Sequence, residues 1–198
     1  YGCLIDGNDV LWSVANGSGL YRHDIPANDV PSFHPAASAY GVGINPCDGS
    51  IWVSSRGTSS EPAFGVISQN VLRQFDSAGT LIGACAQPGF AQGLCVDQNG
   101  DVWVAGGGDV WRFDSACNLI ATVSAGISGT TGCAVDQNGD IWASDQVSHS
   151  AVRINPVTLA TTPTSLGFGA SPYNYSDMTG FVTLGAADTI ACAIAGTN

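Results

Sequence analysis

The feature that most constrains this chain is a stretch of ten residues that occurs twice. VDQNGDVWVA at 96–105 returns as VDQNGDIWAS at 135–144, thirty-nine positions later. Related text surrounds two earlier tryptophans, and the four indoles follow one another at intervals of 40, 51 and 39 residues: Trp12, Trp52, Trp103 and Trp142. A period of about forty residues is typical of solenoids and propellers, whose units stack on their neighbours.

Each unit has the pattern of four short strands. In the third unit these are GLCVD, DVWVA, DVWRFD and NLIATVS, with an Asn-Gly pair between the first two. Asn-Gly favours a type I′ hairpin turn, because both central residues of that turn need positive φ. We expect this turn at Asn99-Gly100 and Asn138-Gly139, and at the equivalent pairs Asp48-Gly49 and Asn8-Asp9.

A four-stranded meander cannot cover both of its own faces, so the units must pack on one another. Radial packing predicts an all-β propeller in which each tryptophan fills the gap between two blades. A parallel β-helix is the competing architecture, but its rungs are shorter and do not favour Asn-Gly hairpins. The sequence predicts about four four-stranded blades and a partial fifth, with approximate bounds 1–38, 39–88, 89–126, 127–166 and 172–198.

The partial fifth unit leaves the expected ring open. Residues 181–195 have the pattern of its first two strands only. An unpaired strand edge invites pairing with another chain. We therefore expect the ring to be closed either by the remainder of a larger chain or by a homo-oligomer.

The charge balance excludes two classes of partner. Fifteen Asp and one Glu against five Arg and no Lys give a formal net charge of -11. Such a field repels nucleic acid and anionic lipid surfaces. No apolar run approaches the roughly 20 residues that span a bilayer. We expect no nucleic-acid partner and no membrane insertion.

The seven cysteines form no CxxC pair and no zinc-binding spacing. They are disulfide-bonded or plain buried thiols, and the disulfide interpretation favours an extracellular or periplasmic protein. Cys85 and Cys117 lie near the fourth strands of consecutive units, and Cys95 and Cys133 lie in first strands. Either pair could therefore form a disulfide between neighbouring blades. Side-chain alternation puts Cys95 and Cys133 on opposite faces, which makes them the poorer pair.

The segments VDQNGDVWVA and VWRFDSACNLI resemble the repeats of bacterial propellers of the NHL and virginiamycin B lyase-like group. In that group the first strand ends in Asp, a turn follows, and an aromatic residue lies in the second strand. The resemblance covers most of residues 1–165, and PYNYSDMTG at 172–180 is similar to a segment near the end of such propellers in large secreted bacterial proteins. It implies the fold and leaves the function open.

The antibiotic-cleaving lyases of this group use His and Glu around a divalent metal, and they have more blades than this chain. One Glu and three scattered His do not provide a matching pair. A non-catalytic binding or assembly module is therefore the main functional prediction, with a metal-dependent lyase or hydrolase as the alternative.

Four of the five arginines occupy one position of the repeat, downstream of each tryptophan: Arg22, Arg73, Arg112 and Arg153. Repetition in register indicates a structural role, in which each pairs with a nearby carboxylate or carbonyl. Asp76 and Asp114 are the candidate partners, three and two residues after their arginines.

The DQNGD stretch also suggests a calcium loop, because Asp97, Asn99 and Asp101 alternate as hard-ion ligands do. Gly100 is fourth and Gly108 twelfth, whereas an EF-hand needs glycine sixth and a carboxylate twelfth. We expect a hairpin turn without a cofactor, with Ca²⁺ binding as the competing hypothesis.

The second unit breaks the pattern. Its tryptophan and arginine are 21 residues apart instead of 9 to 11, so SSRGTSSEPAFGVISQN carries about eleven extra residues between its second and third strands. This insertion holds Arg56, the one arginine out of register, and Glu61, the one glutamate.

Loops of this kind share one rim of a propeller with the loops that connect consecutive blades, and binding groups concentrate on such loops. The candidate rim residues are His34, Arg56, Glu61, His149, Tyr173 and Tyr175. We expect this rim to contact a protein or carbohydrate partner.

Overall fold

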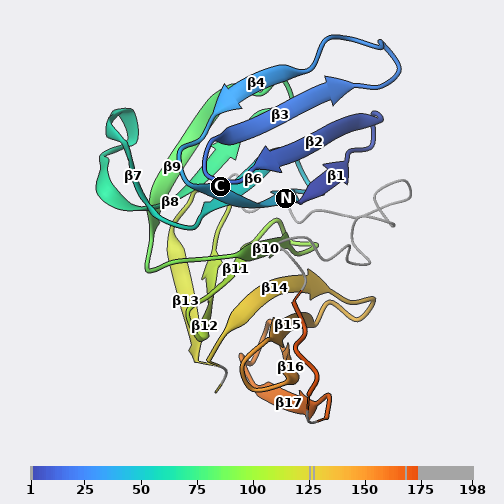
Figure 1. Ribbon diagram of the computed structural model, residues 1–198, viewed down its shortest axis with the longest axis vertical. Coiled ribbons are helices and arrows are strands. Elements are labelled where there is room, and N and C mark those ends of the chain that lie inside the picture. The colour runs from blue at the N-terminus through green and yellow to red at the C-terminus, as the bar shows by residue number, and fades with distance from the viewer. Residues whose placement is uncertain (1, 125, 127, 168, 174–198) are drawn as a thin grey trace, which may run out of the picture.

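The computed structural model describes residues 2–124, 126, 128–167 and 169–173, which form four antiparallel sheets arranged along an arc (Figure 1). The first sheet contains β1 (Cys3–Ile5), β2 (Val10–Ala15), β3 (Gly19–Asp24) and β4 (Ser32–Pro35). The third contains β10 (Gly93–Val96), β11 (Val102–Gly106), β12 (Asp109–Phe113) and β13 (Leu119–Ser124). The fourth contains β14 (Thr130–Val135), β15 (Ile141–Asp145), β16 (Ser150–Ile154) and β17 (Thr161–Ser165). Strands follow one another in chain order across these sheets, as a propeller requires.

The second sheet has an additional strand. It contains β5 (Ala39–Ile44), β6 (Ile51–Ser55), β7 (Thr58–Glu61), β8 (Val66–Phe75) and β9 (Leu81–Gln87), with the short 3₁₀ helix η1 (Pro62–Phe64) between β7 and β8. The predicted insertion is therefore a hairpin: the first part of β8 pairs with β7, and its second part pairs with β6. The hairpin projects from the arc at the left of Figure 1.

The sheets pack face to face, as the repeat predicts. Each of three hydrophobic clusters lies between two consecutive sheets. Trp12, Trp52 and Trp103 are fully buried, one in each cluster. Burying an indole removes a large apolar area from water, which makes these side chains the main contacts between blades. The predicted fifth unit, apart from Pro172 and Tyr173, lies outside the described residues.

The recurrent aspartate explains the repeated ten residues. One carboxylate oxygen of Asp97 accepts hydrogen bonds from the backbone N–H groups of Asn99 and Asp101, and the other accepts one from Trp103 Nε1 at 2.9 Å. Asp6 and Asp136 make the same three bonds in the first and fourth sheets. The motif thus couples the turn to the indole that fills the interface.

The predicted type I′ turn is wrong. Gly100 takes φ 83°, but Asn99 is not among the described residues with positive φ. The backbone N–H of Gly100 donates to the carbonyl of Asp97 instead, and the Asp97 side chain caps the following residue. The connection is a longer turn with one left-handed residue at its end, because the aspartate side chain supplies the bonds that a two-residue turn would lack.

The shared position of the four arginines is only partly confirmed. Trp12 lies opposite Arg22, Trp103 opposite Arg112, and Trp142 opposite Arg153. In the second sheet Trp52 lies opposite Gln74, and Arg73 lies opposite Val53. A displacement of one residue turns a side chain to the other face of a strand. Arg73 therefore serves the inserted hairpin rather than the repeat.

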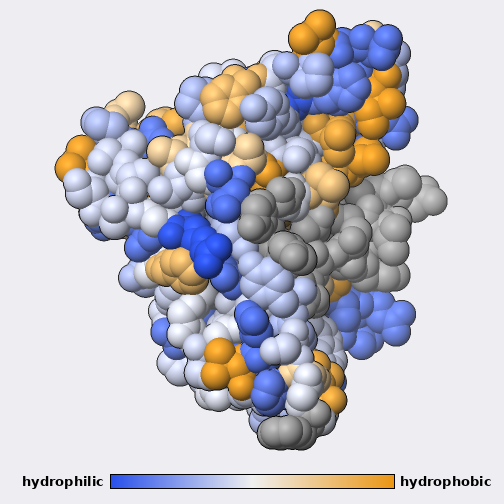
Figure 2. All heavy atoms as spheres, viewed as in Figure 1, coloured by the Kyte–Doolittle hydropathy of each residue, from blue (hydrophilic) through white to orange (hydrophobic). Residues whose placement is uncertain are grey.

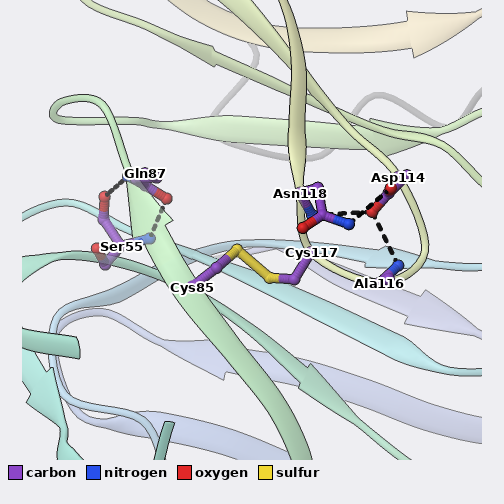
Figure 3. The surroundings of a disulfide bond; sticks show 7 residues. All are labelled: Ser55, Cys85, Gln87, Asp114, Ala116, Cys117 and Asn118. Carbon is purple, nitrogen blue, oxygen red and sulfur yellow. Dashed lines mark hydrogen bonds between the residues drawn. A yellow bond between two sulfur atoms is a disulfide. The ribbon is translucent and has the colours of Figure 1, made fainter. Parts of the chain in front are cut away.

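A disulfide joins Cys85 on β9 to Cys117 in the turn between β12 and β13 (Figure 3), which confirms a bridge between neighbouring blades. Cys95 and Cys133 are buried and unbridged, yet their thiols are within hydrogen-bonding reach of each other. One face of the third sheet packs on the opposite face of the fourth. Because side-chain alternation puts Cys95 and Cys133 on opposite faces of their own sheets, both lie in the interface between these two sheets. Burial, reinforced by Cys133, raises the pKa of the Cys95 thiol, which keeps it protonated.

Candidate functional site

The loops that join second to third strands, and those that join one sheet to the next, form one surface, which we call the loop rim. Backbone hydrogen bonds hold these loops together: Arg56 donates to Ser38 at 2.8 Å, and Ala91 donates to Ser55 at 3.2 Å. Gln146 donates to Gly129 at 3.1 Å at the fourth sheet. The rim is therefore a connected surface on a rigid set of sheets.

Arg56 lies at the second sheet's part of this rim, directly after β6. Its guanidinium carbon is 4.9 Å from the ring centroid of Tyr40 and 5.2 Å from that of Phe90. Arg56 is exposed, and no carboxylate of the described residues lies within 4.0 Å of its guanidinium. Cation–π contacts of this kind hold the cation in place and leave its N–H donors available.

Tyr40 connects Arg56 to Tyr173. The Tyr40 ring is fully buried, and its hydroxyl shares a hydrogen bond with the hydroxyl of Tyr173. The carbonyl of Pro172 accepts a hydrogen bond from Thr131 on β14 at 3.2 Å, which fixes the neighbouring backbone. Two predicted rim residues, Arg56 and Tyr173, thus contact the same side chain, Arg56 at its ring and Tyr173 at its hydroxyl. Tyr175 lies outside the described residues.

Glu61 is held in an ion pair inside the inserted hairpin. Its carboxylate accepts a hydrogen bond from Arg73 Nε at 2.6 Å, and Arg73 is fully buried. The same guanidinium donates to the carbonyl of Ala37 at 3.0 Å and to Ser59 Oγ at 2.9 Å. The pair therefore fastens the hairpin to the loop between the first and second sheets.

The predicted arginine partners are wrong. Asp76 accepts backbone hydrogen bonds from Ala78 and Thr80, and Asp114 caps its own turn in the same way. The observed carboxylate partners are Glu61 for Arg73, Asp101 for Arg112, Asp24 and Asp29 for Arg22, and Asp140 for Arg153. The nearest acidic residue in sequence fails as a guide because turn amides compete for it.

The two predicted histidines lie apart from Arg56. His34 is in strand β4, not in a loop, and its ring packs on Gly79 in the turn between β8 and β9. Its Nε2 is 3.0 Å from Ser32 Oγ, and burial, together with the charge of Arg22, lowers its pKa. His149 lies on the loop rim between β15 and β16, where its carbonyl accepts a hydrogen bond from Leu166.

Two of the three calcium candidates, Asp97 and Asp101, accept hydrogen bonds from protein donors. Both carboxylate oxygens of Asp97 accept the hydrogen bonds described above, and Asp101 accepts one from Arg112 Nε at 2.8 Å. Burial raises the pKa of Asp101, and Arg112 opposes this. Within the described ranges, no three His, Cys, Asp or Glu side chains are grouped to hold a metal ion.

Sequence reasoning missed Tyr40 and Phe90, which form the support for Arg56. Each comes just before or at the start of a first strand, and neither position carries an aromatic residue in every unit. This departure from the repeat was the available signal. The face of the molecule shown in Figure 2 is a mixture of hydrophilic and apolar atoms rather than one continuous apolar surface.

Three solved structures are similar to this chain. A streptogramin B lyase matches with TM-score 0.67 and 13% sequence identity, over 86% of this chain. Virginiamycin B lyase from Staphylococcus aureus matches with TM-score 0.68 and 13% identity over 87% of this chain. The catalytically inactive H270A form of that enzyme with quinupristin matches with TM-score 0.69 and 12% identity over 90% of this chain.

The chain has the fold of a virginiamycin B lyase-like β-propeller. This chain spans 56%, 58% and 59% of those three chains, less than two thirds of their length. No family model matches this virginiamycin B lyase-like propeller, and no curated protein matches it. No helix among the described residues is long and apolar enough to cross a bilayer.

Proposed function

We propose that this propeller is a non-catalytic binding module that contacts a protein or glycan partner through the loop rim at Arg56. The observation that carries the proposal is the exposed guanidinium stacked on Tyr40 and Phe90 with no carboxylate beside it in the described structure. The other four arginines each have a carboxylate within 4.0 Å. The chain has a net charge of -11, yet the Arg56 guanidinium has no carboxylate beside it among the described residues. An arginine in this state favours a ligand that carries a carboxylate group.

The surroundings of Arg56 suit recognition better than reaction. Its pre-positioned planar fork matches a carboxylate in two-point contact, and Phe90 beside it is 41% exposed and offers an apolar face. Acidic sugars and acidic side chains both present this combination of groups. A lyase or hydrolase would need a general acid or base near the bound ligand, and Glu61 is engaged by Arg73.

An NMR titration tests the proposal on the Arg56 Nε–H resonance, with glucuronate and a short Asp- and Glu-containing peptide as carboxylate probes and glucose as the neutral control. We expect shifts with the carboxylate probes and none with glucose. Arg56→Gln should abolish them, whereas Arg153→Gln, which removes the same charge on β16, should leave them unchanged. Equal responses of the wild type and Arg56→Gln would contradict the proposal.

We also propose that the protein works outside the cytoplasm, in the extracellular space or the periplasm. The Cys85–Cys117 disulfide supports this, because such bonds persist in oxidising compartments. Mass spectrometry of the unreduced protein should find the two peptides joined. Recovery of both residues as alkylated free thiols would remove the support.

A further inference from the structure

At each interface between consecutive sheets, the two sheets contribute different kinds of side chain. One sheet contributes a tryptophan on its second strand, and the next sheet contributes aliphatic side chains together with aromatic ones such as Phe75 and Phe113. Trp103 of the third sheet, for example, is fully buried in a cluster with Cys133, Ile141 and Val152 of the fourth. Contacts of this kind run head to tail, so every sheet has a tryptophan face and an opposite face.

An arginine extends two of these interfaces at their outer part. Arg22 Nε donates to the carbonyl of Ser77 at 3.1 Å, and Arg112 Nη1 donates to the carbonyl of Pro156 at 2.8 Å. Ser77 and Pro156 both lie in the turn between the third and fourth strands of the following sheet. The tryptophan face therefore includes a guanidinium that reaches across to its neighbour.

The tryptophan face of the fourth sheet is the exception. Trp142 is partly exposed, whereas its three counterparts have no exposed surface. The Arg153 side chain is 46% exposed, compared with 20% for Arg22 and 19% for Arg112, and it is 3.7 Å from Asp140. None of the described sheets packs on this face, although it carries both groups that the internal interfaces use.

The opposite end of the arc presents the complementary face. On the first sheet Cys3, Ser13, Tyr21 and Phe33 form one row across the four strands. Tyr21 and Phe33 are 41% and 46% exposed, and their ring centroids are 5.0 Å apart. Figure 2 shows apolar atoms gathered at the upper right, over the first sheet.

The turn between β3 and β4, beside that row, is acidic. Asp24 ends β3 and Asp29 lies within the turn; both carboxylates pair with Arg22, and their side chains are 30% and 33% exposed. This turn is the position at which an incoming arginine finds its acceptor in the internal interfaces. Arg153 therefore matches this turn in location, and because two carboxylates there face the single guanidinium of Arg22, the turn keeps the opposite charge.

We propose that these two faces bind each other between two copies of the chain, so that the fourth sheet of each copy stacks on the first sheet of the other. Two identical contacts related by a two-fold axis then close a ring of the eight described sheets, four from each copy. Eight blades is within the range that propellers adopt. The chain, with its four described sheets, spans 56–59% of the lyase chains, which corresponds to a ring of about seven, so closure needs a slightly smaller angle at each interface.

The mass of the 198-residue chain in solution tests this directly. We expect sedimentation velocity and light scattering at physiological salt to give twice the 20.1 kDa of one copy. Because each copy carries a net charge of -11, the dimer should tighten as salt screens the repulsion. A monomer across the micromolar to millimolar range would overturn the proposal and leave further blades of a longer chain as the occupant. A ladder of larger masses would overturn the closed ring.

Two substitutions locate the contact. Tyr21→Glu on the first sheet and Arg153→Glu on the fourth should each raise the dimer dissociation constant by at least about tenfold. Ile120→Glu is the matched control, because Ile120 is 49% exposed on β13 of an internal sheet. Circular dichroism shows whether each variant keeps its sheets. Dimers that Tyr21→Glu and Arg153→Glu leave unchanged would overturn the assignment.

Mixing the two variants gives a test that a general loss of stability cannot imitate. Tyr21→Glu retains an intact fourth sheet, and Arg153→Glu retains an intact first sheet. A mixed pair therefore contains one undamaged interface, and association should recover partly on mixing. Failure of the folded variants to associate better together than apart would contradict the head-to-tail arrangement.

Discussion

The second and third sheets bury the same side chain in different ways. In the third sheet Asp97 accepts the indole hydrogen bond of Trp103 and caps the turn with its other oxygen. In the second sheet Asn45 stands at the aspartate position, and the indole of Trp52 donates to Ser50 Oγ at 3.2 Å instead. The bonds that Asp97 accepts alone in the third sheet are thus divided among Asn45, Asp48 and Ser50 in the second.

The same contrast extends to the third strands. Arg112 lies opposite Trp103 and reaches the next sheet, whereas Gln74 lies opposite Trp52 and donates to Ser50 at 3.2 Å. In the second sheet glutamine therefore replaces arginine at the position opposite the tryptophan, and Arg73, one residue earlier, binds Glu61 of the inserted hairpin. Departures from the repeat are concentrated in the sheet that also carries Arg56.

The largest effect is expected from breaking the Glu61–Arg73 pair, which the other sheets lack. Glu61→Ala leaves a buried guanidinium without its carboxylate, and removing one partner of a buried pair costs about 3–5 kcal/mol. Urea unfolding measures the loss. The double variant Glu61→Leu/Arg73→Met removes both charges and should recover much of it. A single substitution that changes stability by less than about 1 kcal/mol would mean that the hairpin is not held by this pair.

The next effect compares the two ways of burying an indole. Asp97→Ala removes three hydrogen bonds and leaves the Trp103 N–H buried without an acceptor, so we expect a loss of about 3 kcal/mol. Asn45→Ala removes one hydrogen bond to the backbone of Cys47 and leaves Trp52 bonded to Ser50, so we expect about 1 kcal/mol. Urea unfolding of the two variants side by side gives the difference. Equal losses would show that the aspartate has no special role.

A pH prediction compares Ser55 in the second sheet with Asp145, which is in the equivalent position of the fourth. Burial opposes ionisation of Asp145, but hydrogen bonds from Ser148, Ser128 and Val147 outweigh it and lower the pKa of this carboxyl. Its stabilisation of the loop is therefore complete above the ordinary pKa of 3.8 and is lost as pH falls through the lower folded value.

Hydrogen exchange should report this difference between the two loops. The amides of Ser128 and Val147 should lose protection in acid, while the amide of Val71, which donates to the neutral hydroxyl of Ser55, should keep it. Asp145→Asn should remove the difference. Parallel loss of protection at both sites would point to unfolding of the whole chain instead.

The regular sheets could be predicted because the same sequence pattern recurs in each unit. The spacing of Trp12, Trp52, Trp103 and Trp142 defines four sheets, and the extra residues before Arg73 locate the insertion. The contacts of the insertion were not predictable, since Glu61 and Arg73 meet only through the path of a hairpin that occurs once. The Arg56 site combines Tyr40 and Phe90 from separate loops, and nothing in the spacing brings these three together.

The smallest effect concerns the left-handed residue that ends each turn of the regular kind. Gly139 takes φ 83°, while Asp9 occupies the equivalent place with φ 59°. The added methyl of Gly139→Ala makes only an ordinary van der Waals contact with Gln98, at 3.4 Å, but alanine is forced into a strained region, so we expect a loss of about 1 kcal/mol. Asp9→Gly relieves the strain and adds flexibility to the unfolded chain, so we expect a gain of only a few tenths of a kcal/mol. Thermal unfolding can rank the two variants. A stabilising Gly139→Ala would mean that the turn of the fourth sheet does not need glycine at this position, and the first and fourth sheets would then differ in their turns as well as in their sequences.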